Sequence, residues 1–242
     1  MTPYHLTGSI SALLSILASA GLATQVRLLW KRHREGVEGR QISEGLSLNR
    51  FVTSFIMFLA LFTYGGMLRP FNHYLAWPRV LGMSLVLLIL FMMAQDRRCR
   101  HSKAAFLSCL AACLISVGVV LFFPSTEDPN PLLFPLLVVG ASLLYLQGGV
   151  IQIRMIRRLG STGGLSRGMH QLFVLKDLSL ATFALVMGSS TGWPIYFICA
   201  VGLTINVGTL WCFRWVRRGN FQTGNTPGEL PVDFQTVIQK SS

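Results

Sequence analysis

The stretches of sequence that decide the fold are IQIR at residues 151–154 with GLS at 164–166, and TQVR at 24–27 with GLS at 45–47. In both copies a glutamine precedes a basic residue by two positions near the end of an apolar segment. In both, a serine then follows Gly-Leu, where it can cap the first turn of the next helix. The sequence therefore predicts an internal duplication, in which each copy starts on one helix and continues into the next.

Composition identifies the chain as a membrane protein. Hydrophobic residues make up 52% of its 242 residues and charged residues only 12%, whereas an ordinary soluble domain carries about a quarter charged residues. These values exclude a soluble globular domain, a disordered chain, a collagen-like repeat and a coiled coil. The five cysteines have neither zinc-site nor disulfide-framework spacing, so a disulfide-stapled secreted scaffold is excluded as well.

Apolar segments long enough to span a bilayer, which takes about 20 residues, occur seven times, at 6–26, 51–68, 71–95, 104–123, 131–153, 166–189 and 192–213. The first carries no formal charge. It has neither a basic leading region nor a small-residue cleavage site, so we expect a retained helix and not a signal peptide. The predicted fold class is an all-α membrane protein with seven transmembrane helices.

The net charge of +12 comes from 21 Lys and Arg against 9 Asp and Glu. Nearly all of the basic residues lie after the first, third, fifth and seventh apolar segments. Because basic loops stay in the cytoplasm, this asymmetry predicts an outside N-terminus and a cytoplasmic C-terminus. Membrane orientation therefore explains the positive net charge, and nucleic acid is not expected as a partner. The polar segment 219–242 is predicted to be a disordered cytoplasmic tail.

With these motifs the chain resembles the PQ-loop family, which includes the SWEET sugar transporters and lysosomal amino-acid exporters. Tyr64-Gly65 matches the end of the second helix of the family repeat, and Gly82 and Gly202 match the glycine of each third helix. The resemblance implies two three-helix-bundle repeats, 1–101 and 130–218, joined by a linker helix within 102–129 and followed by the tail 219–242. It also implies alternating access around a pocket near the membrane midplane.

The chain departs from the family pattern at two kinds of position. The motif proline is Thr24 in one copy and Ile151 in the other, so a proline hinge is missing from both. The pocket asparagine of the family, three residues before the glycine of each third helix, is Arg79 in one half and Cys199 in the other. The predicted function is transport of a small polar metabolite (an amino acid, organic acid or sugar). Loss of the paired amides argues against a neutral sugar.

Lys176 and Asp177 lie inside the sixth apolar segment. Insertion scales put the cost of such a charge at about 2.5–3.5 kcal/mol, so these residues usually face a cavity or each other. Asp177 follows His170 by seven residues, on the same helix face, and this spacing suggests a proton relay between them. Because neighbours on a helix point about 100° apart, we expect Lys176 and Asp177 not to pair. The alternative is an interhelical charge pair that holds the bundle together.

Other polar residues inside the apolar segments are candidates for the site. Arg79 either binds an anionic group of the substrate or extends outward to the surface. Cys199 and Asn206 are candidate substrate-binding residues together with Arg79 and Lys176. Candidates for a gate or hinge, from the two motifs and the end of the second segment, are Gln25, Gln152 and Tyr64.

No enzyme motif is present, so the chain is not expected to be an enzyme, and no cofactor or metal is predicted. The predicted partners are a small-molecule substrate and the lipid bilayer, and a homo-oligomer is left open. The alternative function is a non-transporting membrane receptor or assembly factor of the same fold. Such a protein would use the basic loop 31–40 and the basic root of the tail as a docking surface.

Overall fold

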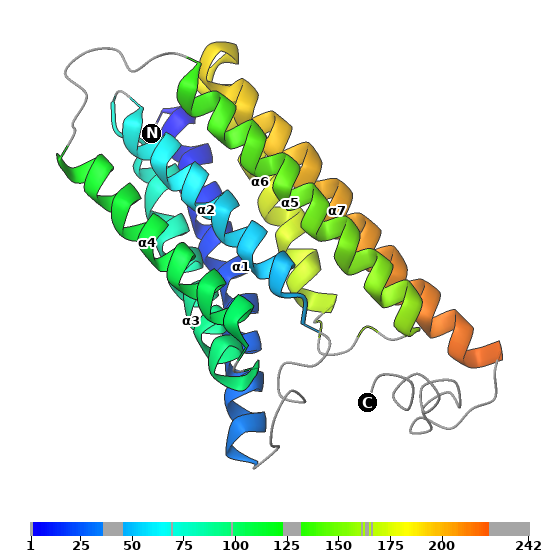
Figure 1. The fold of residues 1–242 in the computed structure, drawn as a ribbon. Helices are drawn as coiled ribbons and strands as arrows, with labels where there is room; N and C mark the ends of the chain where they lie inside the picture. The colour runs from blue at the N-terminus through cyan, green and yellow to red at the C-terminus, as the bar shows by residue number, and fades with distance from the viewer. Residues whose placement is uncertain are drawn as a thin grey trace.

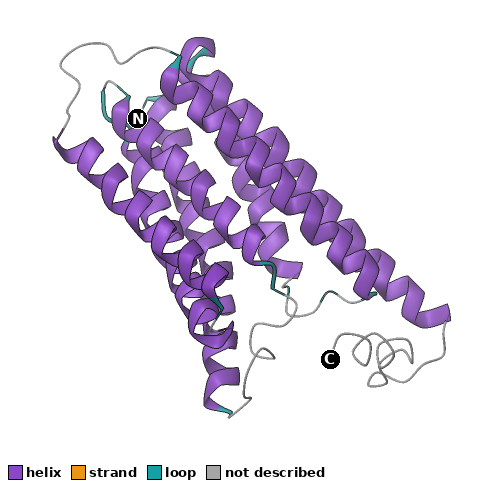
Figure 2. Ribbon diagram, in the orientation of Figure 1, coloured by secondary structure: helices purple, strands orange, loops and turns teal. Residues whose placement is uncertain are grey.

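The computed structural model describes residues 2–35, 46–68, 70–97, 99–122, 132–160, 162, 165 and 167–222. Within these residues the chain forms seven α-helices (Figure 1; Figure 2): α1 Pro3–Arg34, α2 Leu48–Met67, α3 His73–Arg97, α4 Arg100–Phe122, α5 Leu133–Leu159, α6 Arg167–Met187 and α7 Ser189–Gln222. Each is long and apolar enough to cross a membrane. The predicted fold class is confirmed, and the chain is an integral, multi-pass membrane protein.

The ends of the helices follow local sequence signals. Ser47 caps α2, because its hydroxyl accepts a hydrogen bond from the Arg50 backbone N–H at 3.4 Å, as predicted. The equivalent Ser166 lies outside the described residues. At the end of α5, Gly160 adopts φ 60°, a left-handed conformation that glycine takes without steric cost. Helix α7 continues to Gln222, past the predicted boundary at 218, and residues 223–242 are not among those described.

Each half of the molecule is built around its third helix. Helix α3 packs against both α1 and α2, and α7 packs against both α5 and α6. The halves meet through two contacts, α1 against α6 and α2 against α5. Exchanging α1 with α5, α2 with α6 and α3 with α7 leaves this packing pattern unchanged. The halves are therefore related in space as well as in sequence, while the domain boundaries proposed above remain predictions.

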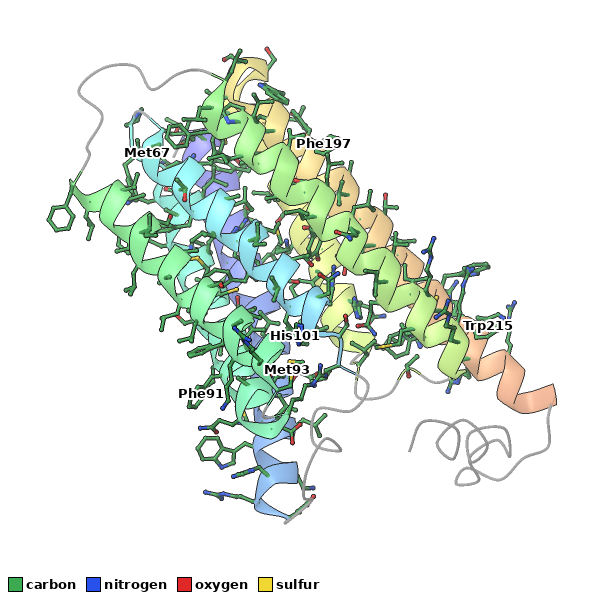
Figure 3. The ribbon with its side chains drawn as sticks, viewed as in Figure 1. Met67, Phe91, Met93, His101, Phe197 and Trp215 are labelled. Atoms are coloured by element: carbon green, nitrogen blue, oxygen red, sulfur yellow. The ribbon has the colours of Figure 1, made fainter. Side chains whose placement is uncertain are left out.

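Helix α4 lies outside this correspondence and packs against α2 and α3 of the first half (Figure 1). A hydrogen bond of 2.6 Å between the Thr63 and Ser116 hydroxyls joins it to α2. Its outer face is apolar and largely uncovered, with Leu114 66% and Ile115 67% exposed. Figure 3 shows apolar side chains projecting outward along the other helices as well. This distribution suits a lipid environment, where no solvated shell is needed.

Equivalent glycines let the two halves approach closely. Gly21 of α1 and Gly148 of α5 each lie four residues before a motif glutamine. A Cβ on Gly21 would lie 2.5 Å from Met169 Cγ on α6, and a Cβ on Gly148 would overlap the Thr53 hydroxyl on α2. A larger residue at either position would force the facing side chain to move, because the backbone of one half lies directly against side chains of the other.

Candidate functional site

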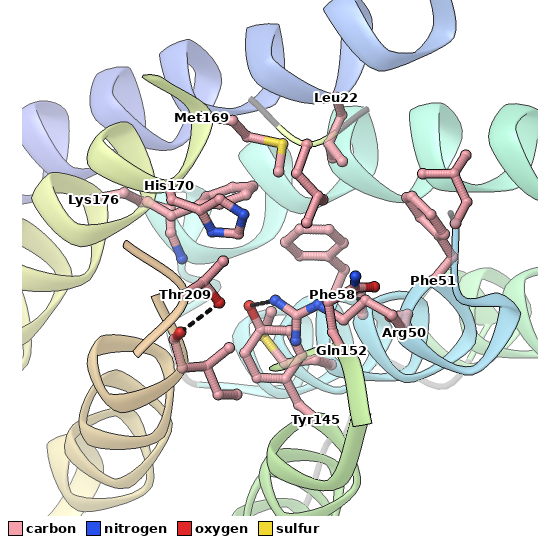
Figure 4. Close-up of a pocket in the computed structure, with 16 residues that line it drawn as sticks. Leu22, Arg50, Phe51, Phe58, Tyr145, Gln152, Met169, His170, Lys176 and Thr209 are labelled. Atoms are coloured by element: carbon pink, nitrogen blue, oxygen red, sulfur yellow. Dashed lines mark hydrogen bonds between the residues drawn. The ribbon is translucent and has the colours of Figure 1, made fainter. Parts of the chain in front are cut away.

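A pocket lies between the two halves, toward the end of the bundle that carries the two motifs (Figure 4). We call this end of the bundle the motif end and the space the central pocket. Helices α2 and α6 supply most of its lining, and α1, α5, α7 and the two motif leucines, Leu46 and Leu165, supply the rest. The α2 residues are Arg50, Phe51, Ser54, Met57 and Phe58, and the α6 residues are Met169, His170, Phe173 and Lys176.

The lining residues come from equivalent positions of the two halves. Counted from the motif serines Ser47 and Ser166, Arg50 and Met169 both come third, and Phe51 and His170 both fourth. The same correspondence pairs Ser54 with Phe173, Met57 with Lys176, and the motif leucines Leu46 with Leu165. The central pocket therefore lies at the interface between the two halves, and each half lines it with the same face.

Arg50 is a cation that lines the central pocket. Its Nη2 donates a hydrogen bond of 2.8 Å to the Tyr145 hydroxyl, and the guanidinium lies 4.2 Å from the centroid of the Tyr145 ring. Its Nη1 is buried and has no hydrogen-bond partner among the described residues. The carboxylates in the described part of the chain are Glu35, Asp96 and Asp177, and no ion pair joins any of them to Arg50. Arg50 thus has donor capacity that the described residues leave unused.

Lys176 and Asp177 form an ion pair, with 2.5 Å between Nζ and Oδ1. The expectation that these neighbours would not pair is wrong. Their backbone positions do diverge by about 100°, but the four-carbon stem of Lys176 reaches around the helix to the shorter Asp177. Both side chains are buried, at 8% and 5% exposed, and water therefore competes little with the contact. Of the two roles considered for Asp177, this geometry favours the structural anchor.

Glycine at position 202 makes room for the Asp177 carboxylate. A Cβ on Gly202 of α7 would overlap Asp177 Oδ2. The equivalent contact of the first half pairs Gly82 of α3 with Phe58 of α2, where a Cβ would lie 3.2 Å from the ring. Phe58 and Asp177 both come eleventh after their motif serine. One backbone arrangement therefore holds a phenylalanine ring in the first half and a charged carboxylate in the second.

Asn206 of α7 connects Asp177 to His170. Its Nδ2 donates to Asp177 Oδ2 at 3.3 Å, and its Oδ1 lies 3.0 Å from His170 Nδ1. Since the amide group of Asn206 must point toward the carboxylate, its oxygen faces the histidine, and His170 Nδ1 must be the donor. In the neutral imidazole Nε2 is then an acceptor. It is buried without a hydrogen-bond partner among the described residues, on a side chain that lines the central pocket.

Arg79 is buried inside the bundle, with 2% of the residue exposed. This burial rules out the alternative in which it extends to the surface. It lies within electrostatic range of the Asp177 carboxylate and near Cys199, which is also 2% exposed. Neither Arg79 nor Cys199 is among the residues that line the central pocket. Together with Lys176, Arg79 puts two cations near one carboxylate in the interior.

The three gate candidates lie in different places. Gln152 lines the central pocket, and Gln25 is buried at 6% exposed but does not line it. Tyr64 is at the opposite end of α2, where its hydroxyl donates a 2.5 Å hydrogen bond to the Thr191 carbonyl of α7. This bond crosses from one half to the other. Tyr64 thus closes the halves against each other at the end away from the motifs.

Aromatic rings close the same end between α1, α3 and α6. Tyr4, Tyr74 and Phe183 form a cluster with centroid separations of 5.2 to 6.0 Å. Phe183 occupies the position in α6 that Tyr64 occupies in α2, both seventeenth after the motif serine. Equivalent residues therefore help to close this end of the bundle as well.

The central pocket is narrow in this conformation. The space open to the centre of a water molecule is about 50 Å³, which holds a few waters, since one water needs about 10–15 Å³ on that measure. A larger molecule would enter only if the halves moved apart. Among the described residues no three His, Cys, Asp or Glu side chains gather where they could hold a metal ion.

Sequence reasoning missed Arg50 and Tyr145. Arg50 lies at the start of α2, where a basic residue looks like an ordinary flank of a membrane span. Tyr145 lies in an apolar segment and carries no signal of its own. The duplication offered one clue to Arg50, because the equivalent position in the second half is Met169. A charge that differs between otherwise matching positions points to a specialised role.

Comparisons with known proteins support the fold at the structural level. No protein-family model and no curated protein matches the chain. A solved structure of a eukaryotic SWEET transporter is similar, with a TM-score of 0.64 and 15% sequence identity, over 90% of this chain and 100% of that one. At this identity the likeness concerns the fold alone, and the chain has a SWEET-like fold.

Proposed function

We propose that this protein is a membrane transporter that moves a small polar metabolite through the central pocket by alternating access. The observation that carries the proposal is the place of that pocket, between two halves that line it with equivalent residues. Transporters built from repeats bind their cargo at such an interface and rock the halves about it. The SWEET-like fold supports the same function by analogy.

Closure at one end supports the mechanism. The Tyr64–Thr191 hydrogen bond and the rings of Tyr4, Tyr74 and Phe183 hold the halves together away from the motifs. For the pocket to open on that side, these contacts must separate while the motif end closes. The proposed gate residues therefore divide into Tyr64 at one end and Gln25 and Gln152 toward the other.

A reducible cross-link across the closed end tests this mechanism. The variant Tyr64→Cys with Thr191→Cys, reconstituted in proteoliposomes, is expected to lose flux when a short bis-methanethiosulfonate reagent bridges the two cysteines, and to recover it when the bridge is reduced. A bridging reagent replaces the length of the tyrosine side chain, which a direct disulfide could not span. Each single-cysteine variant, treated identically, controls for reaction of the native cysteines. Flux that is unchanged in the cross-linked protein would contradict alternating access through this pocket.

Proton coupling through Asp177 and His170 is a separate part of the proposal. Asn206 links the two residues, as a relay would need. The Lys176–Asp177 ion pair instead favours a fixed charge. Asp177→Asn decides between the two roles: loss of the pH dependence of flux, in protein that still folds, supports coupling. An unchanged pH profile assigns Asp177 to structure.

The proposed orientation places the N-terminus outside and the motif end, with the C-terminus, in the cytoplasm. Single cysteines at Ser125 and Thr223, which both lie outside the described residues, should be labelled from outside and from the cytoplasm respectively. Labelling of both from one side would contradict this topology. The receptor or assembly-factor alternative depends on the loop 31–40, of which the described part ends at Glu35, and on the basic root of the tail. No contact among the described residues favours it over transport.

A further inference from the structure

The central pocket has an unused hydrogen-bond donor on one wall and an unused acceptor on the other, and this pair indicates a class of ligand. On the α2 and α5 side, Arg50 presents a guanidinium with a buried Nη1 that has no partner among the described residues. On the α6 side, His170 presents Nε2, which is an acceptor because Asn206 receives the hydrogen from Nδ1. Figure 4 shows both side chains at the wall of the pocket.

The charge around the pocket favours an anion. Lys176 and Asp177 neutralise each other, which leaves Arg50, in the lining of the pocket, without a carboxylate in ion-pair contact among the described residues. A partly buried cation with no ion-pair partner is unfavourable, and a bound anion would relieve it. A guanidinium matches a carboxylate well, because it can donate two parallel hydrogen bonds.

The acceptor at His170 narrows the class further. A hydrogen-bond donor on the ligand would satisfy Nε2, and it could be a hydroxyl or an ammonium group. An ammonium group would add positive charge near Arg50, so a neutral hydroxyl fits better. The few-water volume of the pocket in this conformation suits a small acid better than a hexose.

We propose that the central pocket binds small 2-hydroxycarboxylates, with the carboxylate on Arg50 and the hydroxyl donating to His170 Nε2. The transported substrate is then of this class, an inference that rests on the proposed transport function. Binding can nevertheless be measured without transport, in purified protein in detergent. A failure of one proposal is therefore distinguishable from a failure of the other.

The test compares lactate with three probes that each change one feature. Propionate lacks the hydroxyl, alanine replaces it with an ammonium group, and glucose is a neutral sugar. We expect calorimetry to rank lactate first. Arg50→Met, which installs the residue found at the equivalent position 169, should weaken lactate binding on the order of 10- to 100-fold. Arg154→Met removes a positive charge from an exposed position on α5 and should leave binding unchanged.

His170→Phe, which copies the equivalent residue 51, tests the hydroxyl contact. It should lower lactate affinity on the order of 10-fold and leave propionate affinity unchanged, so that the preference for lactate disappears. If His170 had a purely structural role, the variant would bind both ligands more weakly, and to the same extent. If Arg50→Met does not fold, Arg50→Lys offers a second test. It keeps the positive charge but loses the paired N–H donors of the guanidinium, and it should bind lactate more weakly than the native protein does.

Several results would overturn the proposal. Equal affinities for lactate and propionate would show that the hydroxyl makes no contact with His170. An affinity for alanine equal to or higher than that for lactate would indicate amino acids as the ligands instead. Binding of glucose without any carboxylate would reject an anion site and leave transport standing. Lactate binding that depends on Arg50, without lactate flux in proteoliposomes, would keep the binding site but overturn the inference that this class of acid is the transported substrate.

Discussion

The two halves of the bundle use one scaffold for opposite chemistry. In the first half, the second helix places Met57 and Phe58 at the positions where the sixth helix places Lys176 and Asp177. In both halves, the second of these residues packs on a glycine of the third helix. The apolar version fills the space with an aromatic ring, and the charged version fills it with an ion pair.

The difference shows where a duplicated fold tolerates change. The glycine and the close helix packing are kept, because the backbones could not otherwise approach to this distance. The side chain facing the glycine is free to change if it stays buried and satisfied. In the second half, Lys176 and Asn206 satisfy the carboxylate, whereas the equivalent partners in the first half are Met57 and Val86. The residues around this position are therefore polar in the half that carries the carboxylate and apolar in the half that carries the phenylalanine.

Breaking the ion pair should have the largest effect. Lys176→Met removes the ion-pair partner of Asp177 and leaves its buried carboxylate with only Asn206 and the more distant Arg79, and we expect the free energy of unfolding in detergent to fall by about 3–5 kcal/mol. The double variant Lys176→Met with Asp177→Phe copies the first half. It should be more stable than Lys176→Met, since it leaves no unpaired charge on α6. A double variant less stable than the single one would show that the two halves are not interchangeable here.

Alanine substitutions at Gly202 and Gly82 compare how tightly each half packs at this contact. Gly202→Ala puts a Cβ onto the Asp177 carboxylate, which must move and strain its bonds to Lys176 and Asn206. We expect a loss of about 2–3 kcal/mol, at the upper end of the range for overpacking. Gly82→Ala meets the Phe58 ring at 3.2 Å and should cost about 1 kcal/mol. Thermal unfolding of the purified variants would measure both, and a reversed order would contradict the assigned contacts.

Removing Asn206 should have a smaller effect. Asn206→Val installs a residue equivalent to Val86 of the first half and deletes the hydrogen bonds to His170 and Asp177. Interhelical hydrogen bonds in membrane proteins average about 0.6 kcal/mol each, so we expect a loss of about 1–2 kcal/mol. Chemical denaturation in mixed micelles would measure it, with Val86→Ile as a packing control. A loss no greater than that of the control would mean that Asn206 does not hold the network.

The hydrogen bond to the linker helix should matter least. Thr63→Val keeps the shape of the side chain and removes the bond to Ser116 on α4. Because α4 packs only on the first half among the described helices, we expect a loss of about 0.5 kcal/mol and no change in ligand binding. Ser116→Ala should have the same effect, and the double variant should add nothing further. A change in binding would show that α4 is coupled to the central pocket.

The sequence by itself determined the number of helices, the duplication and the presence of buried charges. Apolar length selects the segments that cross a membrane, because an unsatisfied backbone is excluded from lipid. The repeated Gln and Gly-Leu-Ser motifs located equivalent helices, and Ser47 caps α2 as its position predicted. Lys176, Asp177 and Asn206 stood out because polar residues are rare in such segments. All three belong to one buried network.

Only the tertiary structure decided which of these residues meet. Helical periodicity sets the direction of a backbone position, but the length of the side chain and the space left by other helices decide its contacts. Lys176 therefore reaches Asp177 despite their angular separation, in a space that Gly202 of another helix leaves open. Arg50 resembled an ordinary flanking charge until the packing of α2 against α5 put it beside Tyr145, in the lining of the central pocket. Contacts between distant helices depend on the orientation of both, and neither segment encodes that orientation alone.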